Sequence, residues 1–178
     1  RLCRCESSRL EQLAAWLTMR YQEAHDHLLR WSDSFNRLPQ LIALHDQMDR
    51  VDWLRLLGEN WSGCDNIGRH RLALRRLLPP NGPVLEMMDD AELAAYQLLP
   101  ERLTVFRGCG EINMLGACWS LDRNVAARFP TLNRYHQAAP LLVTATVRRD
   151  RVLALKLDRD EAEIITFQAR RTAIEPLT

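Results

Sequence analysis

The stretch TVFRGCGEINMLGACWSLDRNVAARF, residues 104–129, decides which fold the second half of this 178-residue chain can adopt. It begins with an apolar, β-branched run that ends at Arg107 and Gly108. Asp122 then stands where it can cap a helix that carries apolar residues as far as Phe129. The stretch therefore predicts a strand, a loop and a short helix in succession.

Further strands are predicted downstream, so the second half is expected to be an α+β domain with a mainly antiparallel mixed sheet. Asp89 and Glu92 form a capping pair for a short helix that ends at Pro100. The polar residues 148–151 are typical of a hairpin turn between two strands. Four short aliphatic or β-branched runs predict strands: 103–106, 141–147, 152–157 and 163–167.

The first part of the chain has helical rather than strand periodicity. Apolar residues recur at steps of three and four over 8–32, and Ser8 with Glu11 forms a capping box. The same period resumes at Pro39, which suits a first helical turn, and continues to Gly58. We therefore expect two long amphipathic helices in this part.

The boundary between the two parts is predicted at a cluster of helix-breaking residues. Residues 66–78 favour a third helix, and the proline- and glycine-rich residues 79–83 end it. The expected organisation is a helical region over 1–82 and an α+β core over 83–178. Both are expected to form one compact unit.

Composition limits the classes of function. A hydrophobic content of 47% is enough for a packed core, and 24 basic against 23 acidic residues give no electrostatic reason to expect nucleic-acid or membrane binding. No apolar run approaches the ~20 residues of a membrane span. The cysteines lack paired zinc-ligand spacings, so we expect no metal site and a reducing, cytoplasmic environment. They are Cys3, Cys5, Cys64, Cys109 and Cys118.

Three short motifs could carry chemistry together. They are Arg107-Gly108, Cys118-Trp119-Ser120 and Glu161-Ala162-Glu163. In a strand, Glu161 and Glu163 would point to the same face. Two carboxylates side by side are either solvated or have a role in binding or catalysis. Taken singly, the arginine suits a surface ion pair, the tryptophan a core position, and the cysteine a small buried apolar site.

The order of these motifs resembles the arginine class of the mono-ADP-ribosyltransferase family. Members carry an arginine on the first core strand, a Ser-x-Ser type motif on the next, and a Glu-x-Glu motif near the end. The match here runs from VFRG through CWSLDRNVAARF to RDEAEIITF. The resemblance implies an ADP-ribosyltransferase type of fold and cleavage of NAD between nicotinamide and ribose.

The resemblance also implies roles for particular residues. Glu163 would stabilise the positively charged ribose of the transition state, and Ser120 would brace that carboxylate. Glu161 would face the incoming nucleophile, an arginine guanidinium. The NAD-binding residues would be Arg107 at the phosphates, Gly108 at the carboxamide, Cys118 in place of the family's first serine, Trp119 on the pocket wall, and Phe129 or Tyr135 stacked on nicotinamide.

Three functions stay open on this basis. The first is transfer of ADP-ribose to a macromolecular acceptor, most simply a protein arginine, with a nucleic-acid acceptor also open. The second is an NAD glycohydrolase toxin, in which water attacks. The third is a catalytically degenerate binding or inhibitor module, favoured by Cys118, because a thiol is a poor hydrogen-bonding substitute for a hydroxyl. We expect the protein to act in the cytoplasm. This expectation includes the case of a toxin or effector that is delivered into the cytoplasm of a host or target cell.

Overall fold

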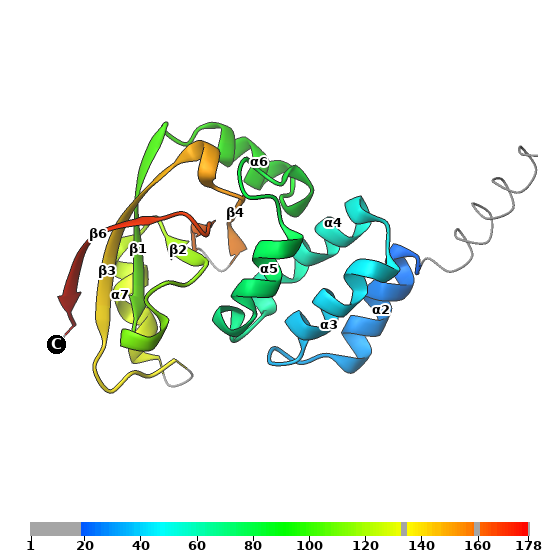
Figure 1. Cartoon of the computed structure of the whole chain (residues 1–178), viewed down its shortest axis with the longest axis horizontal. Coiled ribbons are helices and arrows are strands. Elements are labelled where there is room, and N and C mark those ends of the chain that lie inside the picture. Colours follow the sequence, from blue (N-terminus) through cyan, green and yellow to red (C-terminus); the bar gives the residue numbers. More distant parts are fainter. Residues whose placement is uncertain (1–18, 133–134, 159–160, 178) are drawn as a thin grey trace, which may run out of the picture. The chain divides into compact units, whose positions relative to one another are not determined.

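A computed structural model of the chain describes residues 19–132, 135–158 and 161–177. The chain forms two compact units that divide between Asp65 and Asn66 (Figure 1). We refer to the described residues before this point as the helical unit and to those after it as the sheet unit. The division lies earlier than the expected boundary at residue 82. No helix among the described residues has the length and apolar character needed to cross a membrane.

The helical unit consists of three helices around a small apolar core. Its helices are α2 (Tyr21–Trp31), α3 (Arg37–Leu44) and α4 (Arg50–Asn60). Leu28, Leu38 and Trp53 are fully or almost fully buried between them, and the Trp53 indole N–H donates to the carbonyl of Leu41 at 2.7 Å. The expected helix over 8–32 is present from Tyr21; its capping box at Ser8 and Glu11 lies outside the described residues.

The expected continuous helix from Pro39 to Gly58 is wrong, because the chain breaks at Asp49. This residue is extended, and its carboxylate accepts hydrogen bonds from the backbone N–H groups of Val51 (2.8 Å) and Asp52 (3.4 Å). A carboxylate in this position caps a new helix. The apolar period therefore continues across two helices, α3 and α4.

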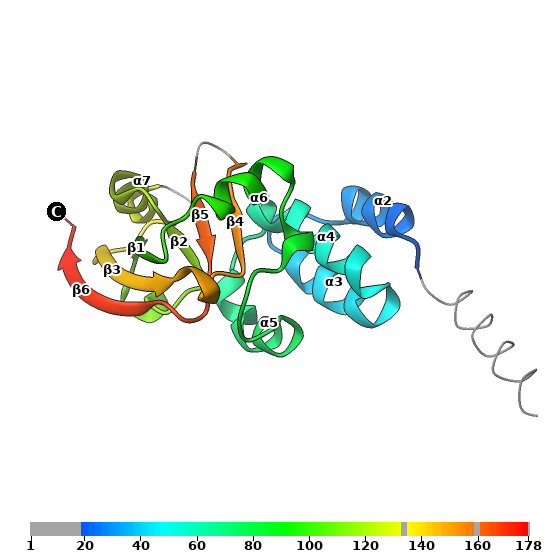
Figure 2. The same cartoon turned by 90° about the horizontal axis from the view of Figure 1, so that it is seen from above.

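The sheet unit has an α+β fold with an antiparallel sheet, as expected. The sheet has the order β4-β5-β2-β1-β3-β6, and all of its pairs are antiparallel (Figures 1 and 2). The strands are β1 (Arg102–Cys109), β2 (Cys118–Ser120), β3 (Leu141–Arg148), β4 (Ala154–Lys156), β5 (Glu163–Ile165) and β6 (Arg170–Pro176). The helices are α5 (Arg71–Leu77), α6 (Asp90–Gln97) and α7 (Arg123–Arg128).

The predicted hairpin at residues 148–151 is wrong. β3 and β4 lie on opposite sides of the sheet, so the segment is a crossover rather than a tight turn between neighbours. It forms the short 3₁₀ helix Arg149–Arg151, and Arg149 donates to the carbonyls of Glu101 (backbone N, 2.8 Å) and Leu99 (Nη1, 2.9 Å). These bonds fix the segment beside the start of β1.

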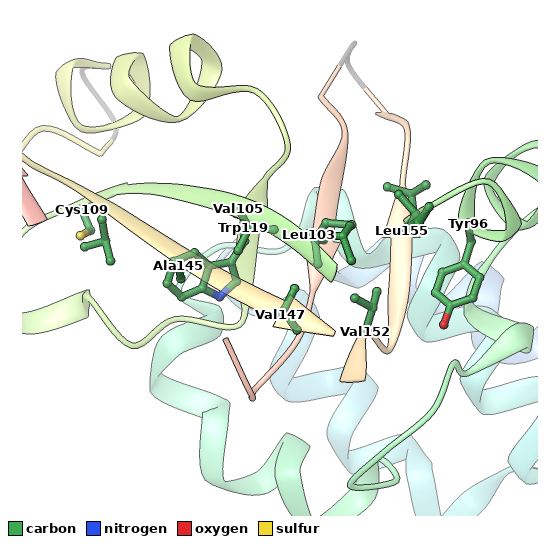
Figure 3. Close-up of a cluster of buried hydrophobic side chains, with 12 residues drawn as sticks. Tyr96, Leu103, Val105, Cys109, Trp119, Ala145, Val147, Val152 and Leu155 are labelled. Carbon is green, nitrogen blue, oxygen red and sulfur yellow. The ribbon is translucent and has the colours of Figure 1, made fainter. Parts of the chain in front are cut away.

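One face of the sheet carries an apolar core. The Trp119 ring lies in it, with Val105 of β1, Ala145 of β3 and Tyr96 of α6 (Figure 3). The cluster also contains Leu99, Leu103, Cys109, Val143, Val147, Val152, Leu155 and Ile164. Because side chains alternate along a strand, the residues between these positions face the other way. On that second face α7 packs against β1.

The β4 edge of the sheet is covered by the segment that leads into α6. The N–H of Val84 donates to the carbonyl of Leu153 at 2.7 Å, and the N–H of Leu155 contacts the Met88 sulfur at 3.4 Å. The N–H of Leu157 donates to the Glu92 carboxylate at 3.1 Å. An uncovered edge strand can pair with another chain. Here the N–H of Leu155 in β4, and the flanking carbonyl of Leu153 and N–H of Leu157, have partners in the covering segment and α6.

A buried ion pair completes this covered edge. Lys156, the single lysine of the chain, places its ammonium 2.6 Å from the Glu92 carboxylate, and the two side chains are 6% and 3% exposed. Glu92 also accepts from the backbone N–H of Asp89 at 3.0 Å, as the sequence capping pair predicts. Three donors thus compensate for the removal of this carboxylate from water.

Replacing Glu92 with alanine should destabilise the protein strongly. The change leaves the Lys156 ammonium buried without its counter-charge, which typically costs about 3–5 kcal/mol. Urea unfolding followed by circular dichroism measures the loss. Glu86→Ala, at an exposed position of the same covering segment, serves as the control and should change stability by less than about 0.5 kcal/mol. Equal effects of the two substitutions would show that the pair contributes little.

Candidate functional site

A row of side chains crosses the sheet at its centre and contains two of the expected catalytic residues. Ser120 of β2 lies directly opposite Phe106 of β1 on one side and Glu163 of β5 on the other. Glu163 in turn lies opposite Lys156 of β4. Directly opposite residues of antiparallel strands have their Cβ atoms about 4.5–5.5 Å apart on the same face. The fold therefore brings Ser120 and Glu163 together.

The Ser120 hydroxyl also connects this row to α7. Its oxygen accepts from the backbone N–H of Asp122 at 3.0 Å. Asp122 then caps α7 by accepting from the N–H groups of Asn124 (2.6 Å) and Val125 (3.2 Å), as the sequence predicted. A hydroxyl that accepts one hydrogen bond still has a proton to donate. Ser120 can therefore donate to a carboxylate on the neighbouring strand.

Glu161 precedes β5 and stands near this row. Its backbone N–H donates to the carbonyl of Asp158 at 3.1 Å, and the next carbonyl, of Ala162, accepts from the N–H of Leu121 at 3.0 Å. The Glu161 side chain is half-buried, and its carboxylate has no hydrogen-bond or ion-pair partner among the described residues. It is thus a carboxylate that a cationic substrate group could engage.

Arg107 lies next to the row in sequence, but its side chain is directed elsewhere. Its neighbour Phe106 shares the face of Ser120, so strand alternation places Arg107 on the core face. The Arg107 guanidinium donates from Nε to the carbonyl of Asn113 at 3.1 Å and from Nη1 to that of Cys118 at 2.7 Å. These two bonds fasten the loop between β1 and β2.

Trp119 fastens the same loop from within the core. The indole is 4% exposed, and its N–H donates to the carbonyl of Gly116 at 3.2 Å. A Cβ on Gly116 would overlap the Arg107 guanidinium, so any other residue here would require that guanidinium to move. Arg107 and Trp119 therefore lie together, on the face opposite Ser120 and Glu163.

Gly108 leaves room for a helix. A Cβ at this position would overlap the backbone carbonyl oxygen of Ala126 in α7 and would crowd the Pro130 ring. The expected reason for this glycine was close approach to a nicotinamide carboxamide. In the structure, the space beside its Cα is filled by α7 and the residues that follow it.

The two aromatic residues proposed to stack on nicotinamide pack against one another. The Phe129 and Tyr135 rings have their centroids 5.1 Å apart and are inclined at 31°. Both are half-buried, and they follow α7 in the chain. Tyr135 is placed by its backbone N–H, which donates to the carbonyl of Leu132 at 2.8 Å.

The cysteines provide no reactive centre that the described part of the chain reveals. Cys64, Cys109 and Cys118 are free thiols, while Cys3 and Cys5 lie outside the described residues. Burial raises the pKa of the Cys109 thiol, and the nearby Arg107 only partly opposes that effect. Cys109 is therefore protonated at neutral pH. Within the described residues, no group of histidine, cysteine and acidic side chains could hold a metal ion.

Two members of the central row were not singled out from the sequence. Phe106 belongs to an apolar strand run and carried no distinguishing signal. Lys156 did carry one, since a single lysine among 24 basic residues occurs inside an otherwise aliphatic strand. A charged residue in such a run is rarely buried without a partner. That pattern could have directed attention to Glu92, which is also an acid of a predicted capping pair.

Comparisons of the chain with protein-family models, with curated proteins and with solved structures found no match. The function of the site therefore has to be argued from its own residues and from the order of its motifs.

Replacing Gly108 with alanine should destabilise the sheet unit without any ligand present. The added methyl group overlaps a backbone carbonyl, which cannot rotate away, and overpacking of this kind costs about 1–3 kcal/mol. Thermal unfolding of the protein without NAD measures the loss. Gly68→Ala is the matched control, because a Cβ there meets nothing within 4 Å. An unchanged melting temperature for Gly108→Ala would mean that α7 does not need this close approach.

Proposed function

We propose that the protein is an NAD-dependent mono-ADP-ribosyltransferase that transfers ADP-ribose to a macromolecular acceptor, most simply a protein arginine. The observation that carries the proposal is the direct cross-strand pairing of Ser120 with Glu163. Glu161 stands two residues before Glu163, with a carboxylate that has no partner among the described residues. Because of the resemblance in motif order, we also propose that the sheet unit has an ADP-ribosyltransferase type of fold.

The chemistry needs a fixed negative charge more than it needs an acid. Nicotinamide leaves NAD with the electron pair of the bond to ribose C1′, and its own positive charge is neutralised as it departs. The ribose becomes an oxocarbenium-like cation. The Glu163 carboxylate, with Ser120 donating to it, would stabilise that cation and hydrogen-bond a ribose hydroxyl. Protonation of the leaving group, which most glycosidases need, is unnecessary here.

The second carboxylate would select the nucleophile. Glu161 would bind the acceptor guanidinium, orient one nitrogen toward C1′ and favour loss of its proton as the new C–N bond forms. Without such an acceptor, water would attack the same cation, so NAD hydrolysis is a side reaction of this site. An NAD glycohydrolase is the same proposal with water as the natural acceptor.

Arg107 takes a different part in this proposal from the one its motif implies. Two of its donor groups already bind carbonyls of the β1–β2 loop. Its contribution would be to hold that loop, rather than to clamp the phosphates with a free guanidinium fork. Gly108, Cys118, Trp119, Phe129 and Tyr135 as NAD-binding residues stay predictions of the resemblance.

Glu163→Gln should lower NAD consumption by about 10²–10³-fold, because it removes the charge that stabilises the cation. The substitution keeps the shape of the side chain, so the melting temperature should change little. Release of nicotinamide by the purified protein measures the activity. Glu111→Gln, an exposed position outside the row, is the control and should retain full activity. Undiminished turnover by Glu163→Gln would remove Glu163 from its proposed role.

Glu161→Gln should lower transfer to a small arginine analogue by a larger factor than it lowers NAD hydrolysis. The amide cannot bind a guanidinium as an ion pair, whereas attack by water does not need that contact. Parallel measurement of released nicotinamide and of modified analogue gives both rates. Equal losses in the two rates would contradict the division of roles between the two glutamates.

The second candidate is a binding or inhibitor module of the same fold that has no activity. Two observations favour it: Cys118 stands where the resembled family has a serine, and the Arg107 guanidinium is engaged by carbonyl groups. Thermal unfolding with and without NAD separates the two candidates, since a ligand that binds the folded state raises the melting temperature. Absence of both stabilisation and turnover would favour the module.

A further inference from the structure

The covered edge of the sheet lies one strand away from the central carboxylate. In the sheet order β4 is followed by β5 and then by β2, and α6 lies beside β4 (Figure 2). Lys156 of β4 is directly opposite Glu163 of β5. The residue that anchors the edge is therefore the immediate cross-strand neighbour of the proposed catalytic carboxylate.

β5 is held in place by its neighbouring strands and by the burial of Ile164 and Ile165. It is three residues long and pairs through three residue positions with β4 and through the same three with β2, which is equally short. β4 is also only three residues long, but its side away from β5 is held by Glu92, Met88 and Val84. A short strand takes its geometry from its neighbours. The edge that the ion pair anchors is thus the nearest fixed support of Glu163.

We propose that Lys156, through its buried ion pair with Glu92, is a positioning residue for Glu163. This inference rests on the proposed function. Lys156 touches no reacting group: its ammonium binds the Glu92 carboxylate at 2.6 Å and the carbonyl of Met87 at 3.3 Å. It holds β4 in register, and β4 sets the place of β5. Loss of the pair would misplace the catalytic carboxylate while leaving the surface that binds the cofactor largely intact.

The test must separate positioning from general stability. The double variant Lys156→Met/Glu92→Gln replaces the ion pair with two uncharged residues of similar size and leaves no unpaired charge. Such replacements often preserve stability. The amide oxygen of the introduced glutamine can still accept from Leu157 N–H. The matched control is Arg148→Met/Asp150→Asn, which removes an exposed ion pair (3.0 Å; side chains 55% and 52% exposed) at the end of β3.

Steady-state NAD consumption at a temperature where each variant is folded gives the first readout. We expect the double variant to lose at least fivefold in kcat, with KM for NAD within twofold of wild type and the control unchanged. A smaller fall in kcat, or a loss carried by KM, overturns the inference. If the double variant does not fold, Glu92→Gln alone is measured against the same limits, because its amide oxygen keeps one of the two acceptor atoms at this position.

Hydrogen exchange gives a second readout that does not depend on activity. In the double variant, amides of residues 161–167 should exchange at least fivefold faster than in wild type, while those of 141–147 in β3 keep their rates. Failure of the wild-type protein to consume NAD would reject the proposed function, and exchange would then decide the positioning inference alone. Unchanged exchange over 161–167, or an equal acceleration in both segments, overturns it.

Discussion

The removal of the Glu92 carboxylate from water is the constraint on which the sheet unit depends. A buried carboxylate costs several kcal/mol unless charge and hydrogen bonds compensate for it. Here the compensation comes from three separate places: the start of its own helix, the ammonium of β4, and the backbone beyond β4. One side chain thereby caps α6, neutralises Lys156 and satisfies the edge of the sheet. Loss of any one of these three interactions would leave a buried polar group without its partner.

The location of the candidate site follows from this closed edge. Ser120 and Glu163 sit on strands of three residues each, between the anchored β4 and the long pair of β1 and β3. Short strands between two fixed supports can hold polar side chains side by side where the surrounding core remains apolar. The core face below them is filled by Trp119 and Ile164. The polar face can therefore be specialised without disturbing the packing that holds the strands.

Local signals in the sequence predicted those elements whose causes are local. The capping acids Asp89 and Asp122 marked the starts of α6 and α7, and the aliphatic runs marked β1 and β3. The hairpin prediction failed because strand order depends on contacts distant in sequence, and 148–151 carries no sign of the strand it leads to. β6 was not predicted, since nearly all of its residues are exposed and it lacks an apolar alternation.

In the site, the pairing of Ser120 with Glu163 agrees with the motif order. That Arg107 shares a face with Trp119 and not with Ser120 depends on the register between β1 and β2, which the sequence does not determine.

The engagement of Arg107 bears on how a cofactor would be bound. Hydrogen bonds that involve a charged group contribute about 1.5–3 kcal/mol each, and the guanidinium makes two of them with loop carbonyls. A phosphate could take both donors only by offsetting that loss and by leaving the carbonyls of Asn113 and Cys118 without these partners. Arg107 is thus better suited to keeping the loop, and with it the start of β2, in place. Arg107, on the strand next to β2, and Lys156, on the strand next to β5, are each engaged by groups of the protein itself. They fix the two flanks of the β2–β5 pair, on which Ser120 and Glu163 lie.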